Sequence, residues 1–344
     1  MTDTTAIDGT VLRGREFEPV EGQVVIEDGR IAAIEEQPAH SDRIVVPAFV
    51  NAHTHIGDSI AKEAGEGLSL SELVAPPDGL KHRLLRAASR AEKVEAMRRS
   101  LSFMETAGTT ACIEFREGGV GGVAAIEEAA AGAGVDPVVL GRETVEAMEA
   151  SDGFGASGAD DGDFAYERNA TARAGKLFGI HAGEVHSGDI NPALDLDPDF
   201  LVHMVHAEQL HLERVADSEI PVVVCPRSNL VTGVGVPPVA DLVDRTTVAL
   251  GTDNVFLNSP SMFREMAYTA KLTDVSARDV LRMATVNGAE VAGLNCGRIE
   301  EGRDADLLVL DGDSDNLAGA RNVVRAVVRR AGVGDVQDVV LSGR

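Results

Sequence analysis

The sequence predicts an α/β fold, a (β/α)8 TIM-type barrel with a small composite β-sandwich built from both chain termini. The chain has 344 residues, which is enough for one large domain or a domain with an appended module. Short apolar runs alternate with helical stretches through the middle of the chain. Both ends carry β-like runs instead, and each end is too small to bury a sheet face alone.

The two chain ends, residues 1–45 and 297–344, are expected to form the composite β-sandwich. At the N-terminal end the turn Asp28-Gly29-Arg30 separates two apolar runs, and an Asp-Gly pair in that position is typical of a β-hairpin. The runs predicted as strands are residues 10–12, 23–27, 31–34, 305–310, 323–328 and 339–341.

Residues 46–296 are expected to form the barrel, because eight strand-like runs with intervening helices over about 250 residues match a (β/α)8 fold. The stretch 152–163, rich in Gly and Asp, predicts a loop that overlaps the fourth run. The expected strands are 44–50, 109–115, 137–140, 153–157, 177–180, 200–205, 220–225 and 247–250, and the expected helices include 80–107, 122–133 and 207–216.

The charge balance limits the classes of partner. The 56 Asp and Glu residues outnumber the 31 Lys and Arg residues, and the formal net charge is −25. Such a charge repels phosphate backbones and anionic lipid, so we expect neither nucleic acid nor a membrane as partner. Only five of the cations are lysines. We interpret the acidic excess as adaptation to a high-salt cytosol, where screening acts over about 3 Å at about 1 M salt.

Three further features predict a cytoplasmic protein. No window approaches 18 uninterrupted apolar residues, so a spanning helix is not expected. The N-terminal residues Met1-Thr2-Asp3-Thr4 lack the basic and apolar regions of a secretory signal. The cysteines, Cys112, Cys225 and Cys296, are odd in number and far apart, which favours a reduced compartment over a disulfide framework.

Polar residues at the ends of the predicted strands mark the candidate site, because active sites of such barrels lie at the carboxyl ends of the strands. His53 and His55 end the first run, and residues two apart on a strand point the same way. This pair alone leaves solvated strand-end histidines as an open alternative. His181, His203 and Asp253 end the fifth, sixth and eighth runs. Three of these imidazoles together with the carboxylate would suit Zn2+ or Fe2+ and leave one position open for water. The strand ends together therefore favour a metal site.

The same motifs resemble those of the amidohydrolase superfamily, in its branch of metal-dependent hydrolases related to cytosine deaminase, guanine deaminase and triazine chlorohydrolase. The resemblance covers essentially the whole chain as an ordered set of motifs. These motifs are residues 46–55 (VPAFVNAHTH), 181–184 (HAGE), 201–206 (LVHMVH), 225–229 (CPRSN), 251–254 (GTDN), 285–290 (TVNGAE) and 297–307 (GRIEEGRDADL).

Carried over residue by residue, the resemblance implies the metal ligands His53, His55, His181 and Asp253. It also implies that Glu184 shuttles protons, that His203 hydrogen-bonds the substrate or a metal-bound hydroxide, and that Asp253 accepts a proton while it binds the metal. Asn229 and Asn254, which lie in the matched motifs, are expected either to contact these groups or to fix the loops that carry them.

One metal ion is expected rather than two, with Zn2+ preferred and Fe2+ as the alternative. Binuclear relatives bridge their metals with a carboxylated lysine at the end of strand four. The only lysine between Leu140 and His181 is Lys176, which precedes the fifth strand and so lies at the wrong end of the barrel.

Three residues are tentative substrate contacts. Glu114 ends the second run, Arg116 begins the Gly-rich loop that follows it, and His206 lies near the sixth run. Arg116 could clamp a substrate carbonyl or carboxylate, although an ion pair with the adjacent Glu117 fits equally well. In so acidic a chain an anionic substrate would need local cations such as Arg116 or Arg227, so we expect a small or polar, neutral or cationic amine.

The resemblance implies a hydrolase of non-peptide C–N bonds that deaminates a small aminated heterocycle through a metal-bound hydroxide. Hydrolysis of a cyclic amide, such as an imidazolone or lactam, is the alternative, and dehalogenation is a third. A non-catalytic binding homologue would require a broken ligand set, whereas all the matched residues are present. The expected partner is a small-molecule substrate, with a homodimer as the assembly to test.

Overall fold

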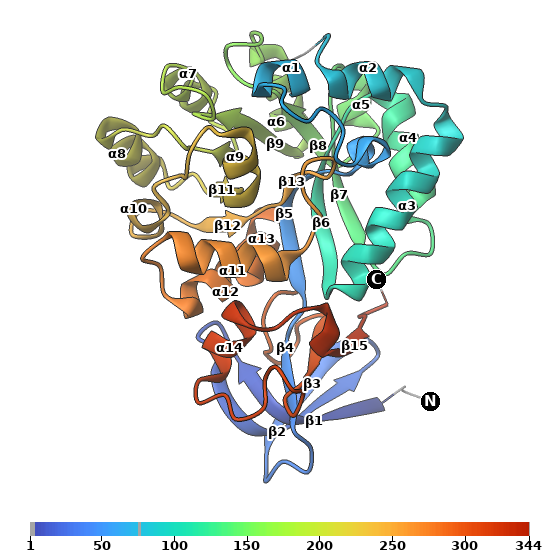
Figure 1. Ribbon diagram of the computed structural model, residues 1–344, viewed down its shortest axis with the longest axis vertical. Coiled ribbons are helices and arrows are strands. Elements are labelled where there is room, and N and C mark those ends of the chain that lie inside the picture. The colour runs from blue at the N-terminus through green and yellow to red at the C-terminus, as the bar shows by residue number, and fades with distance from the viewer. Residues whose placement is uncertain (1–3, 75–76, 344) are drawn as a thin grey trace.

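A computed structural model describes residues 4–74 and 77–343, in which a parallel barrel sheet surrounded by helices stands above a smaller terminal sheet (Figure 1). Residues 1–3, part of the segment from which we expect no secretory signal, lie outside the described residues. Within the described part of the chain, no helix is both long and apolar enough to cross a membrane.

Among the described residues, the barrel sheet contains nine parallel strands in the order β12-β11-β10-β9-β8-β7-β6-β5-β13, and it matches a TIM-like barrel. Each of the eight runs predicted as barrel strands contains or overlaps one of them, including the short fourth run at β8. The strands are β5 (Phe49–His55), β6 (Thr109–Arg116), β7 (Asp136–Gly141), β8 (Gly153–Ala156), β9 (Leu177–Ala182), β10 (Phe200–His203), β11 (Val222–Val224), β12 (Val248–Leu250) and β13 (Asp253–Asn254).

The last two of these strands join the two edges of the sheet. β12 pairs with β11, and β13, which starts only three residues later, pairs with β5. Gly251 lies between them, where a Cβ atom would come within 2.7 Å of His53 Cβ. The backbone at residue 251 can therefore come this close to β5 only because the residue is glycine. This close approach brings Asp253 beside the histidines of β5.

Helices cover the outside of the barrel (Figure 1). The predicted helix 80–107 is divided in two, because Ser89 caps the second part and forms a capping box with Glu92. The helices are η1 (Ile56–Ala61), α1 (Leu70–Val74), α2 (Leu80–Ala87), α3 (Arg90–Thr106), α4 (Gly119–Ala130), α5 (Val145–Glu149), α6 (Ala165–Ala174), α7 (Ile190–Asp195), α8 (Gln209–Ser218), α9 (Pro226–Thr232), α10 (Val239–Val243), α11 (Met262–Leu272), α12 (Ala277–Ala284), α13 (Val286–Ala292), α14 (Val323–Arg329) and η2 (Val333–Asp335).

In the part of the chain that the structure describes, the terminal sheet has six strands in the order β15-β14-β4-β1-β2-β3, so both chain ends contribute to it as predicted. At the predicted hairpin, Asp28 and Gly29 have positive φ values of 48° and 75°, as a tight turn between twisted strands requires. The strands form one hydrogen-bonded series, and the two packed layers of a sandwich stay a prediction. They are β1 (Thr4–Arg13), β2 (Glu18–Glu27), β3 (Arg30–Glu36), β4 (Arg43–Pro47), β14 (Leu307–Asp311) and β15 (Val336–Val340).

The predicted strand 44–50 is in fact two strands in two sheets. β4 pairs with β1 and β14 of the terminal sheet, whereas β5 pairs with β6 of the barrel. The Ala48 N–H between them donates to the Asp306 carbonyl oxygen. The predicted boundary between residues 45 and 46 therefore falls inside β4, and the first barrel strand begins at Phe49.

The prediction of a strand at residues 323–328 is wrong, because this run forms helix α14. The Asn322 side chain caps the helix by accepting from the Arg325 N–H at 2.9 Å. Val324, Val327 and Val328 are buried, at a spacing that places them on one helical face. A Val-rich run fits either a strand or a buried helix, and here the cap and the packing against α11 and α12 decide for the helix.

Candidate active site

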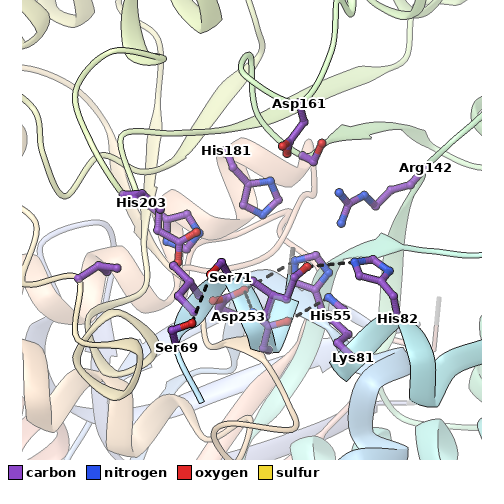
Figure 2. Close-up of a pocket in the computed structure, with 17 residues that line it drawn as sticks. His55, Ser69, Ser71, Lys81, His82, Arg142, Asp161, His181, His203 and Asp253 are labelled. Carbon is purple, nitrogen blue, oxygen red and sulfur yellow. Dashed lines mark hydrogen bonds and ion pairs between the residues drawn. The ribbon is translucent and has the colours of Figure 1, made fainter. Parts of the chain in front are cut away.

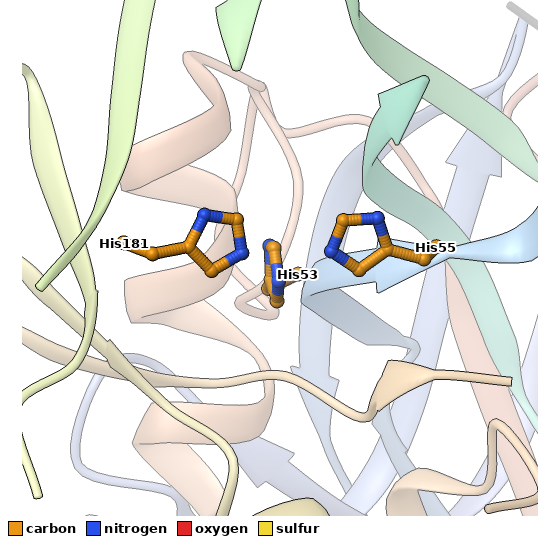
Figure 3. Close-up of side chains that lie close together, drawn as sticks. All are labelled: His53, His55 and His181. Carbon is orange, nitrogen blue, oxygen red and sulfur yellow. The ribbon is translucent and has the colours of Figure 1, made fainter. Parts of the chain in front are cut away.

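Three histidines from two strands converge at the carboxyl end of the barrel, where their side chains point toward one another (Figure 3). The ring centroids of His53 and His55 are 4.9 Å apart, and those of His53 and His181 are also 4.9 Å apart. One ring nitrogen from each of the three residues lies within 4.8 Å of the others. The alternation of side chains along β5 therefore directs both predicted histidines to the same point.

Asp253 and His203 complete the cluster. Asp253 Oδ1 lies 3.4 Å from His53 Nε2 and 3.6 Å from His55 Nε2. His53, His203 and Asp253 form a second group whose ligand atoms lie within 4.8 Å of one another. All four predicted metal ligands and the predicted strand-six histidine are thus brought together at one site.

The residues fit a divalent metal ion. His53 is fully buried, and neither of its ring nitrogens makes a hydrogen bond within the described part of the chain. His181 Nδ1 lies 2.8 Å from the Ala156 carbonyl oxygen, so it donates there and its Nε2 is left as a ligand atom. Buried, unpartnered imidazole nitrogens beside a carboxylate are the donor set that zinc prefers.

The protonation states also suit metal binding. Burial and the nearby Lys81 ammonium lower the pKa of His55 to about 3, and burial together with the surrounding imidazoles lowers that of His181 well below its usual range. Burial acts to raise the pKa of Asp253, but its contacts with His53 and His203 outweigh this effect and hold the pKa well below the usual range. Neutral imidazoles and an ionised carboxylate are the forms that bind metals.

Polar neighbours fix the orientation of Asp253 and His203. Ser228 Oγ donates to Asp253 Oδ2 at 2.5 Å, and Asn254 Nδ2 donates to Asp253 Oδ1 at 3.0 Å. Asn229 Nδ2 lies 3.1 Å from His203 Nδ1. With this amide as donor, Nδ1 of His203 accepts and Nε2 carries the proton. Asn229 and Asn254 therefore contact residues of the site, which is the first of the two roles that we expected.

The backbone is left-handed at both His203, with φ of 81°, and Asp253, with φ of 58°. Side chains other than glycine rarely adopt this conformation, which costs about 1–3 kcal/mol where neighbouring structure enforces it. His203 and Asp253 both belong to the cluster, and strained backbone of this kind is often found at active sites.

A cavity of about 380 Å³ opens above the cluster, and His55, His181, His203 and Asp253 line it (Figure 2). Glu184, the predicted proton shuttle, also lines it, and its Oε2 lies 3.6 Å from His203 Nε2. Burial raises the pKa of Glu184, although the nearby His203 opposes the rise. Glu184 is therefore placed to exchange a proton with a molecule in the cavity.

The tentative substrate contacts Glu114 and Arg116 do not line this cavity. In the strand register Glu114 pairs with Thr54, and its Oε2 accepts from Thr54 Oγ1 at 2.9 Å and from the Ile56 N–H at 2.7 Å. The Arg116 guanidinium lies on the same side, 3.4 Å from Glu114 Oε1, and donates to the Glu117 carbonyl oxygen. Both side chains point away from the barrel axis, so the structure gives no support to the predicted substrate contacts.

His206 and Arg227 are also absent from the cavity wall among the described residues. His206 is half-buried, and its N–H donates to the Gly183 carbonyl oxygen. The buried Arg227 donates to Glu265 Oε2 at 2.6 Å and to the Ser259 carbonyl oxygen at 2.8 Å. Arg227 therefore ties α9 to α11 and does not supply the local cation that we considered.

Sequence reasoning missed four residues at this site. Lys81, His82 and Arg142 line the cavity, and in Figure 2 the Arg142 side chain extends toward His181. Glu117, which we considered only as a loop ion-pair partner, is buried with its Oε1 3.0 Å from His55 Nδ1. The side-chain alternation along β6 could have placed Glu117 beside the axis, had the inward face of that strand been known.

Glu114 gives a prediction about stability. Burial is the main cause that raises its pKa from 4.5 to about 7. The folded state therefore favours the protonated form, so the stability from this group is fully present below pH 4.5 and is lost as the pH rises through about 7. The Glu114→Gln variant should lose up to about 3 kcal/mol of this pH dependence.

Urea unfolding of both proteins between pH 4.5 and 8, at constant salt and with a chelator present, measures the effect. Gln retains an oxygen for the Ile56 N–H, so the substitution removes the titration and keeps an acceptor. Equal pH dependence in the two proteins would show that Glu114 does not titrate in this range.

Comparisons with known proteins identify the family of this chain. The family model described as "Amidohydrolase family" matches residues 44–208 and 182–344. An aminohydrolase-named protein of Methanothermobacter thermautotrophicus is 37% identical, over 94% of this chain and 97% of that protein. A 5-methylthioadenosine/S-adenosylhomocysteine deaminase of Halobacterium salinarum is 28% identical, over 100% of this chain and 92% of that protein.

A solved structure with a similar fold is that of an adenosine deaminase from Xanthomonas campestris with bound zinc. Its TM-score is 0.82 at 20% identity, over 98% of this chain and 92% of that chain. The family match extends from the last strand before the barrel to the end of the chain, and it includes all the residues of the cluster. The chain therefore belongs to the amidohydrolase family, whose members are metal-dependent, and it is a hydrolase that acts on carbon–nitrogen bonds.

Proposed function

We propose that this protein is a metal-dependent deaminase that hydrolyses the exocyclic amine of an aminated heterocycle. The observation that carries the proposal is the position of Glu184. This carboxyl group has a raised pKa and faces the same cavity as three of the four candidate metal ligands, His55, His181 and Asp253. Deamination needs such a group, because a ring nitrogen and the departing amine must both receive protons.

When bound, a divalent ion at His53, His55, His181 and Asp253 would supply Lewis-acid activation of water. Glu184 protonates the ring nitrogen through its carboxyl oxygen, takes up a proton that the attacking water releases, and passes this second proton to the leaving amine. His203 Nε2, which carries a proton when Asn229 donates to Nδ1, donates a hydrogen bond to the oxygen that adds to the ring. Ser228 and Asn254 hold the Asp253 carboxylate in place by donating hydrogen bonds to it, and this carboxylate can accept a proton from the attacking water.

The cavity suits an amine of modest size that carries both polar and apolar groups. Its volume of about 380 Å³ is near the lower end of the usual range for ligand sites. Leu70, Val74, Val185 and Val234 supply the apolar part of the wall, and no Phe or Tyr among the described residues lines it. Because the relative in Halobacterium salinarum is named for adenine-type substrates, aminopurine nucleosides are the first compounds to test.

The proposal is tested by ammonia release from a panel of amines. The panel contains adenosine, 5-methylthioadenosine, S-adenosylhomocysteine, cytosine, guanine, a pterin and an aminotriazine. The protein is loaded with Zn2+ or Fe2+ and assayed in molar salt. We expect ammonia from at least one of them, and release that is slower by about 10²–10⁴-fold from the Glu184→Gln variant loaded in the same way. Parallel samples contain a hydantoin-type cyclic amide and a chlorotriazine. Opening of the amide or release of chloride without any ammonia would overturn the proposal.

Four associated expectations remain to be tested. Zn2+ is the ion that we propose, because imidazole and carboxylate ligands suit it, with Fe2+ as the alternative. We propose one ion rather than two, since Lys176 Nζ donates to the Met148 and Glu149 carbonyl oxygens and not to the site. A homodimer and a cytoplasmic location are proposals as well.

A further inference from the structure

Lys81 is one of only five lysines in the chain, and it is buried at the edge of the candidate metal site. It lies on α2, outside the barrel strands, and its ammonium group reaches the cavity wall. A buried lysine loses most of its hydration, so its charge must be stabilised by specific partners. Three polar side chains surround Nζ, namely Glu117, Asn254 and Asp58.

One of these contacts leads to a metal ligand on β5. Lys81 Nζ lies 2.7 Å from Glu117 Oε1, and the same oxygen lies 3.0 Å from His55 Nδ1. Arg142 Nη1 also contacts this oxygen, at 3.2 Å. A carboxylate at Nδ1 favours the tautomer with the proton on that nitrogen, which directs the lone pair of Nε2 toward the metal site.

The second contact leads to a metal ligand on β13. Lys81 Nζ donates to Asn254 Oδ1 at 3.0 Å, and Asn254 Nδ2 donates to Asp253 Oδ1 at 3.0 Å. The ammonium group fixes which end of the amide faces Asp253, because only the amide oxygen can accept from Nζ. The amide nitrogen of Asn254 therefore faces the Asp253 carboxylate and donates to it.

We propose that Lys81 is a positioning residue that holds two metal ligands in their binding geometry, His55 through Glu117 and Asp253 through Asn254. Its contact with Asp58 Oδ2, at 3.8 Å, is too long for a hydrogen bond and is not part of the proposal. Without the ammonium group, the nearest cation to the buried Glu117 carboxylate would be the Arg142 guanidinium. Asn254 would lose the donor that fixes its orientation, so both ligands would gain freedom to rotate.

Zn2+ affinity tests the proposal, measured on metal-free protein by competition with a chromophoric chelator. The Lys81→Met variant removes the charge and keeps an unbranched side chain. Its Zn2+ dissociation constant should rise about 10–100-fold, the usual effect of losing a group that orients metal ligands. Lys81→Arg keeps a cation and should recover part of the affinity.

The matched control is Lys176→Met. Lys176 is half-buried just before β9, at the end of that strand opposite to the site, and it donates to the Met148 and Glu149 carbonyl oxygens of α5. This variant should lower thermal stability without changing the Zn2+ dissociation constant. A purely structural Lys81 would behave in the same way, so an unchanged dissociation constant in folded Lys81→Met protein would overturn the proposal.

Two further variants keep the test decisive if Lys81→Met does not fold. Glu117→Ala removes the carboxylate that connects Lys81 to His55, and Asn254→Ala removes the amide that connects Lys81 to Asp253. Each should weaken Zn2+ binding at least severalfold, and unchanged affinity in both would overturn the proposal. The inference rests on the metal site of the proposed function, but its readout is affinity alone, so failure to find a deaminated substrate would leave its result standing.

Discussion

Replacing Glu184 with glutamine is expected to lower turnover by about 10²–10⁴-fold and to leave the metal in place. Glu184 lines the cavity beside His203 but belongs to neither group of candidate metal-binding residues. Glutamine keeps the shape and the polarity of the side chain and removes its ability to carry a proton. The loss should therefore appear in kcat, with a smaller effect on metal content or thermal stability.

The measurement combines steady-state kinetics on the best substrate of the panel with metal analysis of the same sample. Glu213→Gln is the control, because Glu213 is exposed on α8 and hydrogen-bonds only Gln209 in the described part of the chain. That variant should match the unmodified protein in turnover and metal content. If Glu184→Gln retained full turnover, another group would have to move the protons.

The cluster of metal ligands could be predicted from sequence because each residue ends a strand run and the barrel brings strand ends together. The direction of the neighbouring side chains could not. On β6, Ile113 and Phe115 face the barrel interior, and the Phe115 ring centroid lies 4.6 Å from that of His53. Glu117 continues this inward series, whereas Glu114 and Arg116 take the opposite face. Without the register against Thr54, either series could have been the inward one.

Lys81 shows a second limit of sequence reasoning. The role of Lys81 depends on Glu117 and Asn254, which are distant in sequence. The residues around Lys81 in α2 therefore give no sign that distinguishes it from an exposed lysine or arginine. The same holds for α14, where packing against α11 and α12 outweighed the β propensity of a Val-rich run. Tertiary contacts decide both cases, so both required the structure.

Replacing His181 with alanine should remove the metal. His181 supplies one imidazole of the cluster, and the Ala156 carbonyl oxygen holds its ring in place. The affinity loss should exceed the roughly 10–100-fold typical of groups that only orient ligands. It can be measured without a substrate, since a metal that binds only the folded state stabilises it by about 2.7 kcal/mol at 100 times its dissociation constant. Adding Zn2+ should therefore stabilise the unmodified protein far more than His181→Ala.

The matched control is His186→Ala, because His186 is exposed near the same strand end and pairs with Asp160. Zn2+ should stabilise this variant as much as the unmodified protein. A His203→Ala sample separates the two groups of candidate ligands, since His181 belongs to one and His203 to the other. Retained affinity in His181→Ala, together with lost affinity in His203→Ala, would assign the ion to His53, His203 and Asp253. His203 could then no longer serve as the free donor to the reacting oxygen, and the proposed proton transfers would have to rest on Glu184 alone.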